Sequence, residues 1–260
     1  MSWKIRLLPR IEPCWPAIPG VCALSTTRVG GVSAAPYESL NLGAHVGDTV
    51  EAVAENRRRL SQQLPKGTEI QWLNQVHGNS VVHAPSRGAP NADACWTTTP
   101  GIALAIMTAD CLPVLLAAVD GSVVAAAHAG WRGLADGVLP NVVSALPCEP
   151  AKVQVWLGPA IGPQSYEVGF EVQAAFAREI ALHSNAGGDP ETLFRPSSRG
   201  DGHSFANLAA IATVQLRDMG ISNIYGGADF DTFSDHRRFF SHRRSGTTGR
   251  QVSTILIAPR

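Results

Sequence analysis

The sequence lacks several features that would place a protein in a particular class. Its five cysteines include no C-x-x-C pair, which argues against a zinc ribbon or a disulfide framework, so we expect reduced thiols and a cytoplasmic location. No stretch of about 18 residues is apolar throughout, because residues such as Pro113 and Asp120 interrupt the longest one, so we expect no transmembrane helix. The prolines at 13, 16 and 19 interrupt the apolar core that a signal peptide needs after Lys4 and Arg6.

The chain also lacks an excess of charge of either sign. Acidic and basic residues number 21 each, so the composition points to neither nucleic acid nor a membrane surface as a partner. A small polar substrate fits this balance better. Internal repeats and low-complexity linkers are absent, and we predict a single domain over residues 1–260, acting as a monomer, whose weakest seam is residues 186–202.

The longest apolar segment, residues 102–133, carries both a cysteine and a histidine. Runs of small and β-branched residues flank Asp120-Gly121, and Asp-Gly between such runs is a strong signal for a two-residue hairpin turn. We therefore predict paired strands over residues 113–119 and 122–128.

This hairpin fixes the positions of its cysteine and its histidine. A two-residue turn places Val119 opposite Ser122 and Pro113 opposite His128. Because side chains alternate along a strand, Cys111 then shares a face with His128 as its diagonal neighbour, roughly 7–8 Å away. That spacing suits one metal ion held between a thiolate and an imidazole, and a buried cysteine beside a hydrogen-bonded core histidine is the alternative.

A helix is predicted over residues 48–64, with Asp48 at its N-cap. Arg57 lies on the same face as the apolar residues of this helix, which are Val50, Val53, Leu60 and Leu64. An arginine on an inward face needs an anionic partner, which is either a buried carboxylate or a phosphate or carboxylate of the substrate. Arg58 and Arg59 are expected to face solvent.

Glycine-bearing loops precede this helix at residues 28–33 and 39–43. Such loops can present backbone N–H groups and an arginine to an anion, although ordinary turns explain the glycines equally well. Asn41 in the second loop is our candidate substrate-binding residue there. His77 follows a strand predicted over residues 71–76, and only its pairing with Cys111 and His128 suggests more than a structural role.

The glycine-flanked turn at residues 130–133 leads into a helix predicted over residues 134–146. The free N–H groups at its start should point toward the Cys111 face, where a substrate oxyanion would lie, and Arg132 is a candidate substrate contact. Further along we predict strands at 153–157, near Ile224 and at 252–257. Helices are predicted at 171–182 and 204–219. Five arginines at 237–250 interleave with Phe239 and Phe240, so part of that segment should be anchored.

Several motifs, taken together, resemble the laccase-domain family, which is also described as multicopper polyphenol oxidase and as purine nucleoside phosphorylase and includes a peptidoglycan editing factor. They are NQVHG at 74–78, TADC at 108–111, AHAGWRG at 127–133, GPAIG at 158–162 and FFSHRRSGTTGR at 239–250. The resemblance implies an α+β fold, with mixed β-sheets sandwiched and helices on the outside, similar to cysteine hydrolases. It also implies that His77, Cys111 and His128 form the metal and catalytic site, and that Arg57 binds substrate or phosphate.

The sequence departs from the family pattern near its C-terminus. Asp231-Thr-Phe233 stands where members commonly have Cys-Thr-Tyr, and Ser245 stands where an aspartate is usual. These changes leave His77, Cys111 and His128 in place. They put in doubt only a role for a second thiol.

Three chemistries compete for this site. The first is phosphorolysis of purine nucleosides combined with adenosine deamination, with zinc as the cofactor and copper as the alternative metal. The second is a cysteine hydrolase that edits peptidoglycan precursors with Cys111 as nucleophile. Copper-dependent oxidation of polyphenols is the weakest, because a multicopper oxidase needs a histidine-rich trinuclear cluster and this chain has eight histidines and no His-x-His pair. A non-enzymatic domain with a structural zinc is a further alternative.

For deamination we expect no carboxylate beside Cys111, because alternation turns Asp110 away in a regular strand.

Overall fold

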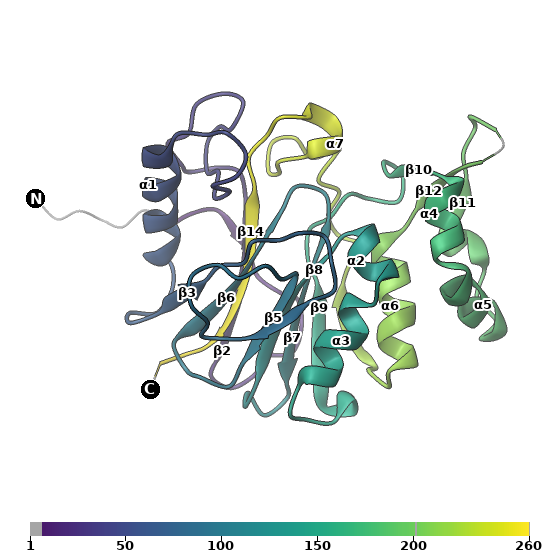
Figure 1. Cartoon of the computed structure of the whole chain (residues 1–260), viewed down its shortest axis with the longest axis horizontal. Coiled ribbons are helices and arrows are strands. Elements are labelled where there is room, and N and C mark those ends of the chain that lie inside the picture. The colour runs from purple at the N-terminus through teal and green to yellow at the C-terminus, as the bar shows by residue number, and fades with distance from the viewer. Residues whose placement is uncertain (1–6, 201, 260) are drawn as a thin grey trace, which may run out of the picture.

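The computed structural model describes residues 7–200 and 202–259, and it confirms the predicted α+β architecture with helices outside two stacked sheets. From left to right in Figure 1, helix α1 (Val50–Ser61) covers a five-stranded sheet, which packs on a six-stranded sheet. Helices α2 (Trp131–Ala135), α3 (Val138–Ala145) and α6 (Leu208–Asp218) cover the far face of the second sheet. The likeness to cysteine hydrolases stays a prediction.

The five-stranded sheet has the order β1-β2-β14-β6-β3. Its strands are β1 (Arg10–Ile11), β2 (Val21–Thr26), β3 (Glu69–Gln71), β6 (Ile102–Thr108) and β14 (Gln251–Ile257). The six-stranded sheet has the order β13-β9-β7-β8-β5-β4. Its strands are β4 (Val81–His83), β5 (Ala94–Thr97), β7 (Leu112–Ala118), β8 (Val124–Ala129), β9 (Val153–Leu157) and β13 (Asn223–Gly226).

The central strands are apolar throughout because both of their faces are covered. Every residue of β6, β7 and β8 is buried. In β6, Leu104 and Ile106 pack between the two sheets, whereas Ala103 and Ala105 pack toward α1. A strand buried on both faces gives a continuous apolar run rather than an alternating one, which explains the composition of residues 102–129.

The predicted hairpin has the predicted register but a longer turn. Pro113 pairs with His128 and Ala117 pairs with Val124, as the sequence analysis expected. The first strand ends at Ala118 and the second begins at Val124. In the turn between them, the N–H of Ala118 donates to the carbonyl of Val123, and the carbonyl of Ala118 accepts a hydrogen bond from the N–H of Gly121. The two-residue loop is therefore wrong, yet the pairing is unchanged because the turn lengthens by the same amount on each side.

Helix α1 begins later than predicted. Thr49, not Asp48, is its N-cap and accepts a hydrogen bond from the N–H of Ala52. Val53 is buried on the inner face as predicted, whereas Val50 is 79% exposed, because it lies in the first turn beyond the edge of the sheet.

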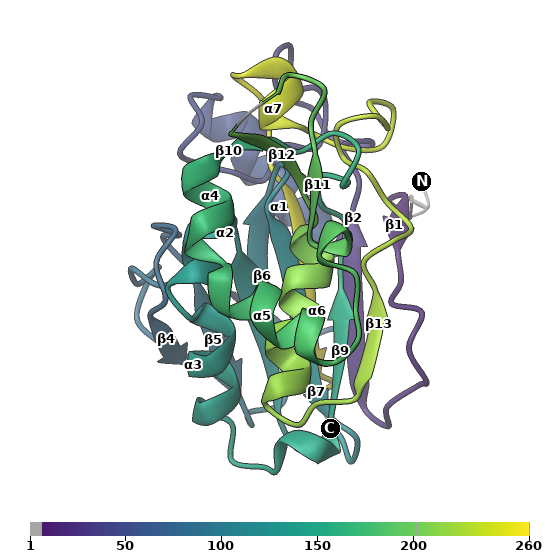
Figure 2. The same cartoon turned by 90° about the vertical axis from the view of Figure 1, so that its right-hand side faces the viewer.

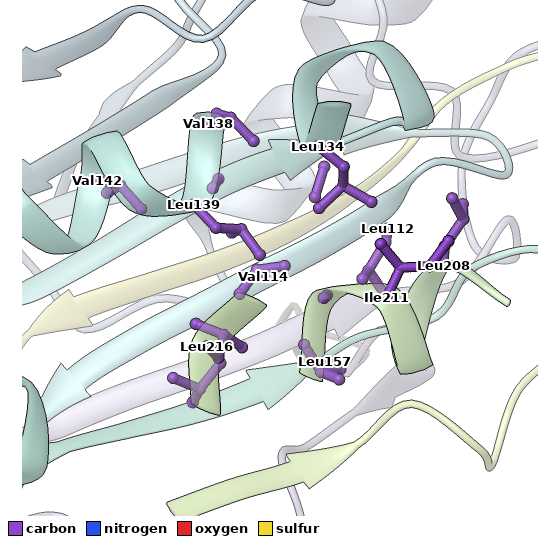
Figure 3. Close-up of a cluster of buried hydrophobic side chains, with 14 of the residues drawn as sticks. Leu112, Val114, Leu134, Val138, Leu139, Val142, Leu157, Leu208, Ile211 and Leu216 are labelled. Carbon is purple, nitrogen blue, oxygen red and sulfur yellow. The ribbon is translucent and has the colours of Figure 1, made fainter. Parts of the chain in front are cut away.

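The helix predicted over 134–146 is divided in two at Gly137, which has a φ of +85° that favours glycine. The predicted inward residues are nevertheless all buried: Leu134, Val138, Leu139, Val142 and Leu146. Figure 3 shows most of these side chains meeting Leu112 and Val114 of β7 and Leu208, Ile211 and Leu216 of α6. This layer anchors α2 over the end of β8.

A smaller lobe projects beyond these helices, at the right of Figure 1 and toward the viewer in Figure 2. It contains a three-stranded sheet of the order β10-β12-β11 and helices α4 and α5. The bounds are β10 (Glu167–Gly169), α4 (Phe170–Ala175), α5 (Ala177–Asn185), β11 (Phe194–Pro196) and β12 (His203–Ala206).

Both predicted helices in this region are corrected. The helix expected over 171–182 breaks at Phe176, whose buried ring packs on Phe194. The helix expected from Ser204 begins only at Leu208, because residues 203–206 pair in the sheet and Asn207 forms the N-cap.

The strand predicted over residues 71–76 is also shorter, since β3 ends at Gln71 and only Asn74 makes a further bridge. None of the helices in the described ranges is long and apolar enough to span a bilayer. Lys4 and Arg6, which entered the signal-peptide argument, lie outside the described residues.

Candidate active site

The structure brings His77, Cys111 and His128 together at one end of the space between the two sheets. Their potential ligand atoms all lie within 4.8 Å of one another. The rings of His77 and His128 meet edge to face, with 4.8 Å between their centroids. His128 is buried, Cys111 is half-buried and His77 is exposed, so the group opens to solvent on the His77 side.

The backbone reaches this arrangement by two unusual turns. Cys111 directly precedes β7 and follows Asp110, whose φ is +99°. His77 itself has a φ of +60° and lies in a loop rather than at the end of a strand. Positive φ in a non-glycine residue is uncommon and needs support from its surroundings.

Asp93, which the sequence analysis did not single out, supplies that support for His77. This carboxylate is fully buried just before β5. It accepts backbone N–H groups from Val76 at 3.1 Å, His77 at 3.0 Å and Gly78 at 2.8 Å. Three donors converging on one carboxylate fix the turn that carries the His77 ring.

The same carboxylate orients His128. Asp93 Oδ1 lies 2.8 Å from His128 Nδ1, and this contact leaves Nε2 of the imidazole for the site. Burial by itself would raise the pKa of Asp93, but the hydrogen bonds from His128 and from the backbone of Gly78 outweigh it and lower the pKa. Asp93 therefore stays ionised behind the histidine.

Charge separation stabilises Cys111 and His128 as a pair. Burial opposes ionisation of both, but the charge of His128 and hydrogen bonds from His128 and His77 lower the pKa of Cys111 to about 6. The Cys111 thiolate and the Asp93 carboxylate together overcome burial and raise the pKa of His128 to about 9. Without metal, the two side chains form a thiolate–imidazolium pair near neutral pH.

Helix α2 begins at this group, as predicted. A Cβ placed on its N-cap, Gly130, would lie 3.0 Å from Cys111 Sγ and 3.5 Å from His77 Cδ2. Only glycine fits there without displacing a site side chain. Arg132 in the same helix is exposed, and its guanidinium stacks 4.6 Å from the ring of Trp131.

Arg57 is half-buried on the inner face of α1, as predicted, but its partner is not a carboxylate. Its Nε donates to the carbonyl of Leu42 at 3.0 Å, and its guanidinium stacks 3.8 Å from the ring of Trp72. Among the described residues no carboxylate lies within 4.0 Å of it. Of the two partners considered, the buried carboxylate is thus excluded for the described chain.

Arg250 and His45 extend this positive region, and neither was proposed from the sequence. The Arg250 guanidinium donates to the carbonyls of Thr248 and Gly249, and burial lowers its pKa while the charges of Cys111 and Asp110 raise it. The pKa of His45 is lowered by burial and then by the charges of Arg250, Arg57, His77 and His128, in that order. Its position thus connects the two arginines with the two site histidines.

Asn41 is fully buried, and its amide is already used within the protein. Its Oδ1 accepts from the backbone of Gly43 and Arg250, and its Nδ2 donates to Asp48 and to the carbonyl of Gly43. Asn41 therefore positions the Arg250 backbone, and a direct substrate contact would require these bonds to break.

Asp110 is not available as a base. Its carboxylate accepts from the Thr232 hydroxyl and from the backbone N–H of Arg243, both at 2.7 Å. Tyr166 is near enough to Cys111 and Asp110 for their charges to affect it. Burial and these two charges raise the pKa of Tyr166, whereas the charges of Arg243 and Arg132 lower it. The Arg243 guanidinium stacks 5.1 Å from the Tyr166 ring.

The C-terminal arginine segment is anchored, as its phenylalanines predicted. Phe239 and Phe240 are fully buried, and Arg244 donates to the carbonyls of Thr232, Phe233 and Phe239. Asp231 accepts hydrogen bonds from the N–H of Gly162 and the hydroxyl of Ser165 and so fixes the 158–162 loop. Its role is structural in this chain.

The donor set suits one metal ion. Two imidazoles and a thiolate on converging, partly buried positions are ligands for zinc or copper, and the Asp93 contact to His128 is the usual support for a metal-bound histidine. In the described part of the chain no other group of three histidine, cysteine or acidic side chains meets in this way. A trinuclear cluster has no ligands there.

Comparisons with known proteins identify the family and the fold of the chain. A family model described as multi-copper polyphenol oxidoreductase laccase matches residues 22–258. The chain is 49% identical to a purine nucleoside phosphorylase of Pseudomonas aeruginosa over 247 residues, covering 95% of this chain and 98% of that protein. It is 45% identical to purine nucleoside phosphorylase YfiH of Escherichia coli, with the same coverage. A crystal structure of a Neisseria meningitidis protein superposes with a TM-score of 0.88 at 43% identity, covering 96% of this chain and 99% of that one.

The thiolate–imidazolium pair predicts selective alkylation. In metal-free protein, the rate of Cys111 modification by iodoacetamide should rise as the pH passes about 6 and then level off, because the pKa of Cys111 is lowered to that value. Cys148, whose pKa is raised by burial, should stay slow until the pH exceeds its ordinary value of 9.0. Peptide mass spectrometry gives both rates, and superimposable pH profiles for the two cysteines would contradict the pairing.

Asp93 should control metal affinity. Asp93→Asn removes the charge behind His128, and the affinity for zinc should fall about tenfold to a hundredfold. Asp120→Asn is the matched control, because Asp120 lies in the turn at the opposite end of the β7–β8 hairpin. Competition with a zinc-binding dye measures both affinities, and circular dichroism checks folding. Equal affinities in the two variants would show that Asp93 acts on the fold alone.

Proposed function

The chain belongs to the multi-copper polyphenol oxidoreductase laccase family, and from that membership and the geometry of the site we propose that it is a purine nucleoside phosphorylase that also deaminates adenosine. Both reactions are assigned to one site that contains zinc, with His77, Cys111 and His128 as its catalytic and metal-binding residues. The Pseudomonas aeruginosa and Escherichia coli relatives are named as purine nucleoside phosphorylases, which supports the phosphorylase half.

One observation carries this proposal beyond the relatives' names. Arg57 and Arg250 are half-buried, and neither has a carboxylate partner among the described residues. Their charges lower the pKa of His45, as do the charges of His77 and His128. Uncompensated guanidinium groups beside a nucleophile-activating site are the feature expected of phosphate binding. Phosphorolysis needs such a subsite, and hydrolysis of a neutral amide does not.

The residues divide the work of phosphorolysis as follows. Arg57 and Arg250 hold phosphate against the ribose C1′ carbon, which the phosphate oxygen attacks as the bond to the purine breaks. Asp93 holds the His128 ring through Nδ1, so that Nε2 faces the metal site, and the departing purine takes its proton from water on the exposed His77 side. Tyr166 and Arg132 contact the nucleoside, and both are near enough for the charges of Cys111 and Arg132 to affect the pKa of Tyr166.

His77, Cys111 and His128 would hold the zinc ion, which when bound supplies a Lewis acid and a water of lowered pKa. Zinc is favoured over copper because a three-donor site that leaves one position open matches the usual catalytic zinc site. Asp93 also answers the question of a carboxylate for deamination. It lies behind His128 rather than beside Cys111, so it would orient His128 as a zinc ligand, and the proton transfers of deamination would use water.

The alternative is a cysteine hydrolase acting on an amide of a peptidoglycan precursor. The thiolate–imidazolium pair of Cys111 and His128 favours it, since this is the arrangement of an activated nucleophile. Bound metal would occupy that thiolate, so the two activities make opposite demands on the same sulfur. Copper-dependent polyphenol oxidation remains the weakest proposal, because the described residues offer ligands for one ion only.

We further propose that the chain acts as a single-domain monomer in the cytoplasm. All five cysteines are unpaired in the structure, which suits a reducing compartment. Its proposed partners are its small-molecule substrates, a purine nucleoside and phosphate.

The proposed function is tested by assaying both reactions on one preparation. Zinc-loaded protein should release hypoxanthine from inosine only when phosphate is present, and should convert adenosine to inosine. His77→Ala and Cys111→Ala should reduce both activities in parallel by at least about a hundredfold, and inosine should inhibit deamination competitively, because the site is shared. Cys148→Ala, which alters a half-buried thiol after the end of α3, is the control.

Two results would overturn this assignment. The first is cleavage of a muramyl-peptide amide by protein that releases no purine base, which would favour the cysteine hydrolase. The second is full stoichiometric zinc in Cys111→Ala protein by elemental analysis, which would remove Cys111 from the metal site.

Arg57 should determine the affinity for phosphate. Arg57→Ala removes charge-assisted hydrogen bonds worth roughly 1.5–3 kcal/mol, so KM for phosphate should rise at least about tenfold. Arg58→Ala is the matched control, because Arg58 is adjacent, exposed and paired with Glu55. Initial rates at varied phosphate give both constants. An unchanged KM combined with a lowered melting temperature would mean that Arg57 only supports the packing of Trp72.

A further inference from the structure

A cavity of about 540 Å³ lies away from the His77–Cys111–His128 group and shares no residue with it. Its walls come from the N-terminal segment, the outer faces of β2 and β14, and the end of α1. The apolar part of the wall includes Trp15, Ile18, Leu24, Leu64 and Leu256. This volume falls within the usual range for small-molecule sites, about 300–1,000 Å³, and the wall combines these apolar side chains with the polar ones of Arg10, Glu12, Gln63 and Thr254.

A single buried hydroxyl distinguishes this cavity from a simple surface groove. Thr254 lines it and is only 1% exposed, and its Oγ1 has no hydrogen-bond partner among the described residues. In β14 it pairs with Leu24 of β2 and Ala105 of β6, so its lateral neighbours are apolar. A buried hydroxyl left unbonded costs free energy, and a ligand that bonds it would remove that cost.

The charged groups at the cavity compensate one another. Arg10 donates from Nε and Nη2 to Glu12 Oε1, so the two charges are already paired. Gln63 uses its side-chain carbonyl to accept the N–H of Leu8. No net charge remains to favour an ion, so the site selects an uncharged molecule.

We propose that this cavity is a second binding site, which takes a neutral, planar aromatic molecule with one hydrogen-bonding group. The flat surfaces of Trp15, Pro13 and Pro65 contact the ring system, and the polar group bonds the Thr254 hydroxyl. Binding there is independent of the proposed phosphorylase activity, because no site residue is shared.

Coumarin is a suitable probe because it is neutral, planar and carries one carbonyl acceptor. Equilibrium dialysis should show saturable binding to the full chain with Kd below about 1 mM, as for a small ligand of modest efficiency. Cys22 lines the cavity whereas Cys14, also exposed, does not. Bound coumarin should therefore slow alkylation of Cys22 at least about threefold and leave Cys14 unchanged.

Two pairs of variants test the assignment. Thr254→Val keeps the shape and removes the hydroxyl, so coumarin affinity should fall about three- to tenfold. Cys22→Trp should abolish binding by filling the cavity, whereas Cys14→Trp, the matched control, should bind as the unmodified chain does. Both tryptophan variants alter exposed positions, and thermal melting confirms folding.

The proposal is overturned if coumarin neither saturates nor protects Cys22. It is likewise overturned if Cys22→Trp binds as Cys14→Trp does, or if Thr254→Val binds with unchanged affinity. None of these readouts uses catalysis, so a failure here is separate from a failure of the phosphorylase assignment.

Discussion

The site depends above all on the buried carboxylate of Asp93. It accepts three consecutive backbone N–H groups of the 76–78 turn and also contacts His128 Nδ1. One charged group thus holds both histidines, although they come from a loop and from a central strand. A buried carboxylate is tolerated only when it is fully hydrogen-bonded, and here four donors satisfy it, so any change at Asp93 alters the fold of the loop and the chemistry of the site together.

This dependence bears on both roles proposed for Cys111, as a metal ligand and as a nucleophile. The Cys111 thiolate and, after it, Asp93 raise the pKa of His128 in the absence of metal, and the His128 charge in turn lowers the pKa of Cys111. The thiolate that results is the form that binds zinc and also the form that attacks a carbonyl. Metal binding must displace the His128 proton, so occupancy should fall as the pH is lowered, and the choice between the two chemistries rests on the metal rather than on the fold.

The sequence predicted those parts of the site that follow from strand geometry. The register of the β7–β8 hairpin, and with it the common location of Cys111 and His128, came from alternation and a turn signal. Asp93 was missed because its partners are backbone N–H groups of a distant loop, which no local pattern encodes. A lone aspartate among the apolar residues 92–95 was the available signal. The predicted start of α1 was wrong because Asp48, the predicted N-cap, instead accepts hydrogen bonds from the distant residues Ser33 and Asn41.

That competition at Asp48 also supports the side of the site for which we propose phosphate binding. Because Thr49 caps α1, the Asp48 carboxylate is free to accept from Ser33 and Asn41. Asn41 in turn accepts the backbone N–H of Arg250, and the buried Asn56 of α1 donates to the carbonyl of Asn41. A chain of satisfied polar contacts therefore runs from the start of α1 to Arg250, while Arg57 projects from the same helix. Helix α1 thus carries Arg57 directly and supports the backbone of Arg250 through Asn56 and Asn41, and two guanidinium groups supported in this way would suit the tetrahedral phosphate of the proposed reaction.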